Sequence, residues 1–193
     1  MIGLTIDRIE MGDSAQITRR VTGGDIAEFV DAVGDYNPVH SDREYAAATP
    51  FKEPIAPGIW TAGLISAVIG TRLPGPGAIY VSQELKFLKP VKSGDSISAR
   101  VEVIEINREK NRIRLRTVCM NQRAEDVLIG EAVVMPSRTP IDYTRSMETM
   151  GALALWTLQP LAWVAQGATI MGMLGLSALS AAASVSSSRP SAK

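Results

Sequence analysis

The stretch PGIWTAGLISAVIG, residues 57–70, decides the fold of this chain. Placed on a helix, it is apolar around nearly its whole circumference, so the predicted helix has to be buried. Four strand-like stretches follow it, separated by turns rich in Gly, Asn and Asp. They are residues 79–88, 96–106, 112–120 and 127–135. One buried helix followed by four long strands predicts an antiparallel sheet curled around that helix.

The residues before this helix add one strand and one further helix. Residues 16–22 alternate between apolar and polar side chains, which favours a strand. Helically spaced apolar residues then predict a helix over residues 25–33, beginning near Gly24. Together these elements predict an α+β domain over residues 1–138 with the hot-dog arrangement, in which a sheet wraps around a central helix.

The composition is that of an ordinary globular protein. Of 193 residues, 46% are hydrophobic and 21% are charged, with 20 basic and 20 acidic side chains. This balance, and the lack of a basic stripe, argue against a nucleic-acid partner. The single cysteine, Cys119, excludes an intrachain disulfide and suits a reducing cytoplasm. The first residues are too acidic for a secretory signal.

The loop GDYNPVHSD, residues 34–42, contains the only histidine of the chain, His40. One histidine and one cysteine cannot supply a His-cluster or zinc site, so no metal is expected. Any reaction near neutral pH that needs an imidazole has to use His40. Taken alone, a loop histidine is more often structural, and Asp35 is explained as well by a turn cap.

The hexapeptide DYNPVH, residues 35–40, resembles the signature of MaoC-like dehydratases and (R)-specific enoyl-CoA hydratases. Phe29 supplies the upstream aromatic residue of that signature, and Ala46 supplies its downstream small residue. The resemblance covers about residues 5–137 in order. It includes the helix start at residue 57, the turns LPGPG (73–77) and KPVKSGD (89–95), and GEAVVM (130–135).

The resemblance implies reversible syn hydration of a trans-2-enoyl-CoA to an (R)-3-hydroxyacyl-CoA, without a metal or redox cofactor. Asp35 and His40 would activate the water and return a proton to the same face, and we do not divide these roles between them. Five positions apart across a Pro-containing loop, they can converge on one water, and such a pair contributes about 10²–10⁴-fold in rate. The resemblance also implies that Asn37 braces the loop and that Ser66 forms a hydrogen bond near Asp35.

Gly58 is the third expected component of the site. It opens the buried helix, where free N–H groups and the helix dipole favour negative charge, and a glycine lets a carbonyl approach closely. The resemblance assigns the oxyanion donor to its N–H. Pro57 departs from the family, in which His often precedes this glycine. Considered alone, Gly58 would be only a helix-start glycine.

The C-terminal segment, residues 139–193, has a different composition. Residues 149–188 contain no charged side chain, and residues 161–185 would be about 37 Å long as a helix. We expect a hydrophobic helical extension that tethers the protein to a membrane or polyhydroxyalkanoate granule, with a disordered end. The alternative is a hairpin packed on the hot-dog core.

Several assignments remain open from the sequence. The resemblance implies a homodimer that acts on an acyl-CoA thioester in the cytoplasm and supplies hydroxyacyl-CoA to processes such as polyhydroxyalkanoate synthesis. One alternative is a dehydratase for acyl-carrier-protein substrates, or for branched or dicarboxylic CoA esters. Another is a non-catalytic hot-dog scaffold bound to a membrane or granule.

Overall fold

The computed structural model describes residues 1–144. The expected helical extension and tether lie beyond Thr144, outside the described residues. Within the described part, no helix is long and apolar enough to cross a membrane.

Five antiparallel strands form the main sheet, in the order β2-β4-β5-β6-β3. The strands are β2 (Ser14–Arg20), β3 (Ile79–Phe87), β4 (Ser96–Asn107), β5 (Arg112–Met120) and β6 (Asp126–Met135). The four strands after the apolar helix therefore begin and end within one residue of their predicted bounds. β2 ends earlier than predicted, because Thr22 leaves the strand to cap the next helix.

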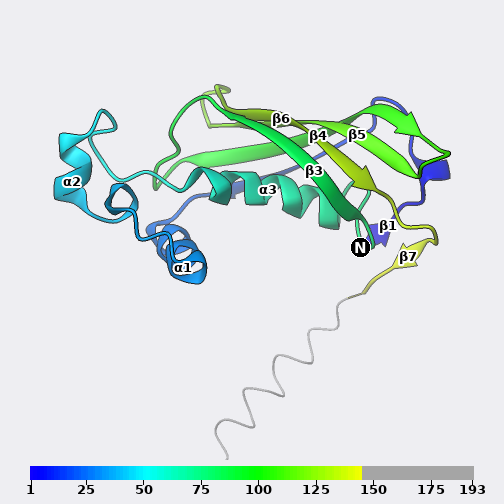
Figure 1. Ribbon diagram of the computed structural model, residues 1–193, viewed down its shortest axis with the longest axis horizontal. Coiled ribbons are helices and arrows are strands. Elements are labelled where there is room, and N and C mark those ends of the chain that lie inside the picture. Colours follow the sequence, from blue (N-terminus) through cyan, green and yellow to red (C-terminus); the bar gives the residue numbers. More distant parts are fainter. Residues whose placement is uncertain (145–193) are drawn as a thin grey trace, which may run out of the picture. The chain divides into compact units, whose positions relative to one another are not determined.

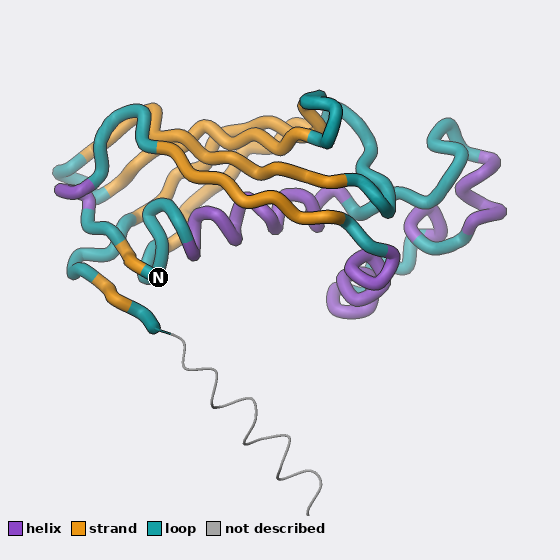
Figure 2. The backbone as a smooth tube through the Cα atoms, turned by 180° about the vertical axis from the view of Figure 1, so that it is seen from behind, coloured by secondary structure: helices purple, strands orange, loops and turns teal. Residues whose placement is uncertain are grey.

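The apolar stretch forms α3 (Gly58–Thr71), which lies against one face of the sheet (Figures 1 and 2). Its packed face consists of Trp60, Thr61, Leu64, Ile65, Val68 and Ile69. The inward-facing residues of β4 and β5, including Val101 and Leu115, are fully buried beneath it. The helix has one exposed side, on which Ile59 is 58% exposed. The architecture is the predicted hot-dog fold.

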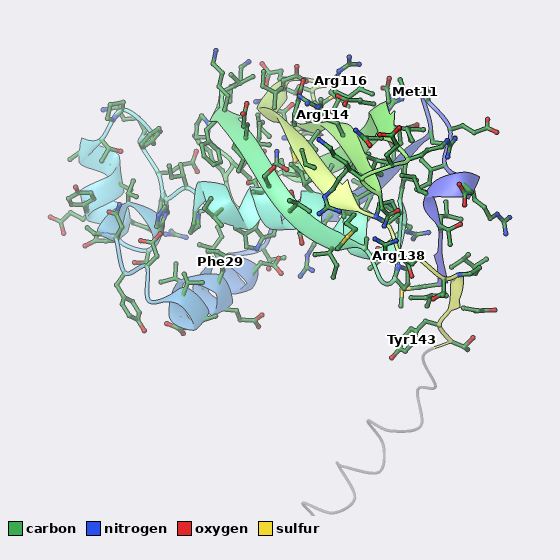
Figure 3. All side chains as sticks on the ribbon, turned by 45° about the vertical axis from the view of Figure 1, so that its right-hand side comes forward. Met11, Phe29, Arg114, Arg116, Arg138 and Tyr143 are labelled. Atoms are coloured by element: carbon green, nitrogen blue, oxygen red, sulfur yellow. The ribbon has the colours of Figure 1, made fainter. Side chains whose placement is uncertain are left out.

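The outer face of the sheet is charged. On β5, Arg114 forms ion pairs with Glu105 and Glu131, and Arg116 pairs with Glu102. Figure 3 shows both arginines on the side of the sheet away from α3. The alternation of buried and exposed residues along β5 is typical of a sheet with one face on the core and one in water.

Two helices lie at the end of the sheet where α3 begins (Figure 1). α1 (Gly23–Val33) starts with a capping box, in which Thr22 and Asp25 each accept the other's N–H. It ends at Gly34, whose φ of 74° is readily adopted only by glycine. The sequence did not predict α2 (Arg43–Ala48), which follows a single 3-10 turn, Pro38–His40.

A second, two-stranded sheet lies at the other end of the domain (Figure 1). It pairs β1 (Ile2–Gly3) with β7 (Ile141–Asp142), and a 3-10 turn (Ile6–Arg8) follows β1. This pairing brings the two ends of the described chain together. It also extends the compact unit to Thr144, beyond the expected domain boundary at residue 138.

Candidate active site

Asp35 and His40 lie at opposite ends of the loop that follows α1. Gly34 turns the chain out of the helix, and the Asp35 N–H still donates to the Val30 carbonyl at 3.2 Å. His40 ends the Pro38–His40 turn. The loop brings His40 Nε2 to 3.5 Å from Asp35 Oδ2, so the two side chains face each other as predicted from their spacing.

A backbone carbonyl fixes the tautomer of His40. Its Nδ1 lies 2.8 Å from the Ile55 carbonyl oxygen. A carbonyl can only accept, so Nδ1 carries a proton and Nε2 is the atom that faces Asp35. The His40 side chain is only 9% exposed, whereas that of Asp35 is 46% exposed. The imidazole is therefore held rigidly, and the carboxylate lies on the open side of the pair.

The geometry of this pair suits a shared water. At 3.5 Å the two groups are too far apart for a strong direct hydrogen bond. In the neutral imidazole, Nε2 is an acceptor, and an ionised carboxylate is also an acceptor. A water beside them can donate one hydrogen to each group, which leaves its oxygen lone pairs pointing outward. That is the arrangement required of a water that attacks carbon.

Asn37 holds the loop between the two groups. Its Oδ1 accepts from the Val39 N–H at 3.3 Å and caps the Pro38–His40 turn. The His40 N–H in turn donates to the Asn37 carbonyl at 3.0 Å. These contacts agree with the expected bracing function, which stays a prediction until it is measured.

Residues 55 and 56 join the loop to the start of α3. The Ile55 N–H donates to Val39 O at 3.2 Å, and the Ala56 N–H donates to Val91 O at 2.7 Å. Ile55 also forms an isolated antiparallel bridge with Lys92. The His40 ring and the first turn of α3 are thereby fixed to one short backbone segment.

Gly58 begins α3 beside an apolar cavity of about 430 Å³. The first N–H groups of a helix have no acceptor within the helix, so they are available to a ligand. The cavity is lined chiefly by apolar side chains, among them Phe51, Ile59, Phe87 and Leu128. A Cβ at Gly58 would stand 2.7 Å from Phe87 Cε1, so only glycine fits without moving that ring.

His40 lines a different cavity, of about 730 Å³, between α1 and the α2 region. Its walls carry both charge signs, from Asp31, Arg43, Lys52 and Glu53. Pro54 lines the cavity of His40, and the next residue, Ile55, lines the cavity of Gly58. The two cavities therefore adjoin, and the segment around Ile55 forms the wall between them.

Ser66 is not brought to Asp35 within this chain. It lies on the exposed side of α3, two turns beyond Gly58, and its hydroxyl forms no hydrogen bond within residues 1–144. The expected contact near Asp35 is therefore absent from the single chain. The structure also adds site residues that the sequence did not suggest, namely Ile55 and Phe87. Ile55 acts through a carbonyl that every residue carries, so no sequence signal marks it.

No group of three or more His, Cys, Asp or Glu side chains within residues 1–144 could hold a metal ion. The expectation that the reaction needs neither a metal nor a redox cofactor stays a prediction.

Comparison with known proteins places this geometry in a family. The MaoC like domain matches residues 7–124, and the chain belongs to this MaoC-like dehydratase family. An (R)-specific enoyl-CoA hydratase of Rhodospirillum rubrum is 47% identical over 131 residues, which cover 67% of this chain and 90% of the relative. A 3-hydroxybutyryl-CoA dehydratase of Methylorubrum extorquens is 44% identical over 140 residues, or 72% and 88% of the two chains.

Solved structures agree with the fold. The unliganded R-hydratase PhaJ1 of Pseudomonas aeruginosa superposes with a TM-score of 0.71 at 41% identity. The match covers 75% of this chain and 93% of that one. The family and the hot-dog fold inferred from DYNPVH and the helix at residues 57–70 are both confirmed.

Proposed function

We propose that this protein is an (R)-specific enoyl-CoA hydratase that interconverts trans-2-enoyl-CoA and (R)-3-hydroxyacyl-CoA. The observation that carries the proposal is the pairing of His40 Nε2 with the Asp35 carboxylate at 3.5 Å, beside the first turn of α3. The names of the relatives at 44% and 47% identity support the same activity.

In the hydration direction, the water held by Asp35 and His40 attacks the β-carbon of the enoyl thioester. As the new C–O bond forms, the π electrons move onto the thioester oxygen to give an enolate, and the pair takes one proton from the water. The Gly58 N–H stabilises the enolate oxygen, a type of contact worth roughly 2.7–4 kcal/mol. The α-carbon then takes a proton from the pair on the same face, so that the net addition is one water.

The apolar cavity supports a substrate with an apolar portion next to its carbonyl. Phe51, Ile59 and Phe87 surround the position that a thioester carbonyl takes at the Gly58 N–H. Few polar atoms there can compete with the reacting water. The product, (R)-3-hydroxyacyl-CoA, is the type of monomer that polyhydroxyalkanoate synthesis consumes.

The homodimer is part of this proposal. β3 is an edge strand of the sheet, and Ile79, Tyr80 and Val81 on it are exposed. An exposed apolar edge strand is normally covered. A second copy that pairs along β3 would extend the sheet and cover these exposed side chains. A monomeric mass in light scattering at micromolar concentration would contradict the dimer.

The C-terminal tether and the cytoplasmic location are also proposals. Their support is the charge-free sequence of residues 149–188 and the single cysteine, Cys119, which is buried and free in the described chain. Fractionation of the full-length protein and of residues 1–144 tests the tether. Equal partition of the two between soluble and membrane or granule fractions would rule it out.

The loss of enoyl absorbance with crotonyl-CoA and longer trans-2-enoyl-CoAs tests the activity. We expect hydration by the unmodified protein, chirally pure (R) product, and a fall of several orders of magnitude in Asp35→Asn and His40→Ala. Hydration of crotonyl-carrier protein but not crotonyl-CoA would favour the carrier-protein dehydratase instead. Inactivity on every thioester would favour the scaffold.

A further inference from the structure

The cationic side chains around the His40 cavity differ in whether they are paired. Lys92 is held by Glu53 at 2.5 Å, so each neutralises the other. Arg43 and Lys52 line the cavity and form no ion pair with any residue of 1–144. These two cations are therefore available to an anion that enters the cavity.

The cations just outside the cavity are already occupied. Lys89 and Arg123 both contact Glu125, at 2.7 and 2.8 Å. Hydrogen bonds from Asn121, Lys89 and Arg123 lower the pKa of Glu125 to about 2. An anion passing along this surface would have to displace a carboxylate here, but not at Arg43 or Lys52.

Arg43 begins α2, and Lys52 lies four residues beyond its end at Ala48. Arg43 lies three positions after His40, and the Asp42 side chain caps the helix by accepting the Tyr45 N–H at 3.0 Å. Lys52 follows the helix with a φ of 64°, and its N–H donates to Thr49 O at 3.2 Å. Both cations are thereby held close to the catalytic loop.

The remaining charge of the cavity wall favours an anion. Glu53 is engaged by Lys92, which leaves Asp31 as the other carboxylate among the lining residues, together with Arg43 and Lys52. Two cations against one carboxylate leave a net positive wall. Arginine binds phosphate oxygens through a planar fork of donors, and lysine adds a compact point charge.

We propose that Arg43 and Lys52 bind the phosphate groups at the far end of the substrate's pantetheine arm, so that the charged cavity recognises the CoA part of the thioester. This inference rests on the proposed hydratase function. The acyl thioester lies against Gly58 and the apolar cavity, and the arm passes His40 to reach the phosphates.

Three thioesters that differ in their phosphates measure how much the phosphates contribute to binding. They are crotonyl-CoA, crotonyl-phosphopantetheine with one phosphate, and crotonyl-pantetheine with none. In the double variant Arg43→Ala, Lys52→Ala we expect kcat/KM for crotonyl-CoA to fall at least about tenfold, chiefly through KM. The loss should be much smaller with crotonyl-pantetheine. Equal losses with all three substrates, or no loss with crotonyl-CoA, would overturn the proposal.

The phosphopantetheine ester identifies which phosphate is bound. A loss as large as with crotonyl-CoA assigns the site to the phosphate beside the arm, which carrier proteins share. A loss confined to crotonyl-CoA assigns it to the 3′,5′-ADP end. Asp31→Asn should act in the opposite direction and lower KM for crotonyl-CoA, because it removes the opposing carboxylate.

The matched control is Lys110→Ala. Lys110 lies in the turn after β4, whereas Ser93, which lines the cavity, lies just before that strand. The two are therefore separated by the length of β4, and we expect no change in this variant.

Calorimetric titration with free CoA keeps the test independent of catalysis. Binding by the unmodified protein that weakens about tenfold in the double variant would support the site even if neither protein hydrated any thioester. CoA binding of this kind without hydration of any thioester would reject the hydratase function but not the phosphate site. Failure of the unmodified protein to bind CoA would reject the phosphate site.

Discussion

The two cavities next to the loop of Asp35 and His40 share one wall yet differ in chemistry. The cavity beside Gly58 takes Ile55 and Ala56 from that wall and is lined mostly by apolar side chains, with Thr61 and Lys89 as its polar lining residues. The cavity beside His40 takes Lys52, Glu53 and Pro54 and carries charges of both signs. An acyl-CoA has the same two parts, an apolar acyl thioester and a charged nucleotide. A short extended segment can therefore divide the two parts and still fix the His40 ring through the Ile55 carbonyl.

Among the changes that compare the two cavities, the largest effect is expected on the apolar side, from Gly58→Ala. The added methyl would stand beside the N–H that we propose as the donor to the enolate oxygen, and 2.7 Å from Phe87 Cε1. We expect kcat to fall on the order of 10²–10³-fold in the crotonyl-CoA assay. The double variant Gly58→Ala, Phe87→Ala relieves the contact with the ring but keeps the methyl. Recovery of kcat in that double variant would show that the single variant loses activity through its clash with the Phe87 ring. It would then not lose activity because the methyl keeps the thioester carbonyl away from the Gly58 N–H.

A smaller effect, the dependence of KM on salt concentration, should distinguish the charged cavity from the apolar one. Raising the ionic strength from about 0.05 to 0.5 M screens exposed charges, because the Debye length shortens to a few ångströms. We expect KM for crotonyl-CoA to rise several-fold and KM for crotonyl-pantetheine to change little. Parallel changes with both substrates would mean that the charged cavity does not distinguish them.

The smallest effect concerns Cys119, which lies behind the wall of the apolar cavity. Its Sγ is 3.8 Å from the carbonyl of Thr61, a lining residue, and burial raises its pKa from 9.0 to about 12. The folded protein should therefore not react with Ellman's reagent at pH 8 and should react once unfolded. Rapid labelling of the native thiol would show that water reaches this wall.

The same shift has a consequence for alkaline stability. The unfolded thiol ionises near pH 9, whereas the folded thiol stays neutral up to about pH 12. The contribution of Cys119 to stability is therefore fully present below pH 9 and is lost as pH rises from 9 toward 12. Denaturant titrations of the unmodified protein and Cys119→Ala should differ in slope with pH only in that window.

The repeating patterns of the sequence predicted the elements with strong periodicity. α3 was found because its sequence is apolar around nearly its whole circumference, and the strands after it were found from side-chain alternation between turns. The elements that were missed have no such repeat. α2 is a six-residue helix that depends on its Asp42 cap, and β1 and β7 are two-residue strands defined only by their pairing with each other.

The candidate site divides in the same way. Asp35 and His40 could be singled out because one loop carries both of them and because its hexapeptide DYNPVH resembles the signature of the family. The contacts of the Ile55 carbonyl and the Phe87 ring depend on how distant segments pack, which no local pattern encodes. The exposed position of Ser66 has the same origin, since which side of α3 packs on the sheet depends on how the helix meets distant strands.

The pairing of β1 with β7 makes the domain nearly a closed ring. The Met1 amino group donates to Tyr143 O at 2.7 Å, and the Tyr143 N–H returns a bond to Met1 O at 2.8 Å. A short linker could join these ends, and the chain could then be opened in a surface turn such as the one between β4 and β5. The same fold could then form from a chain in which the elements follow one another in a different order. The domain is therefore suited to circular permutation.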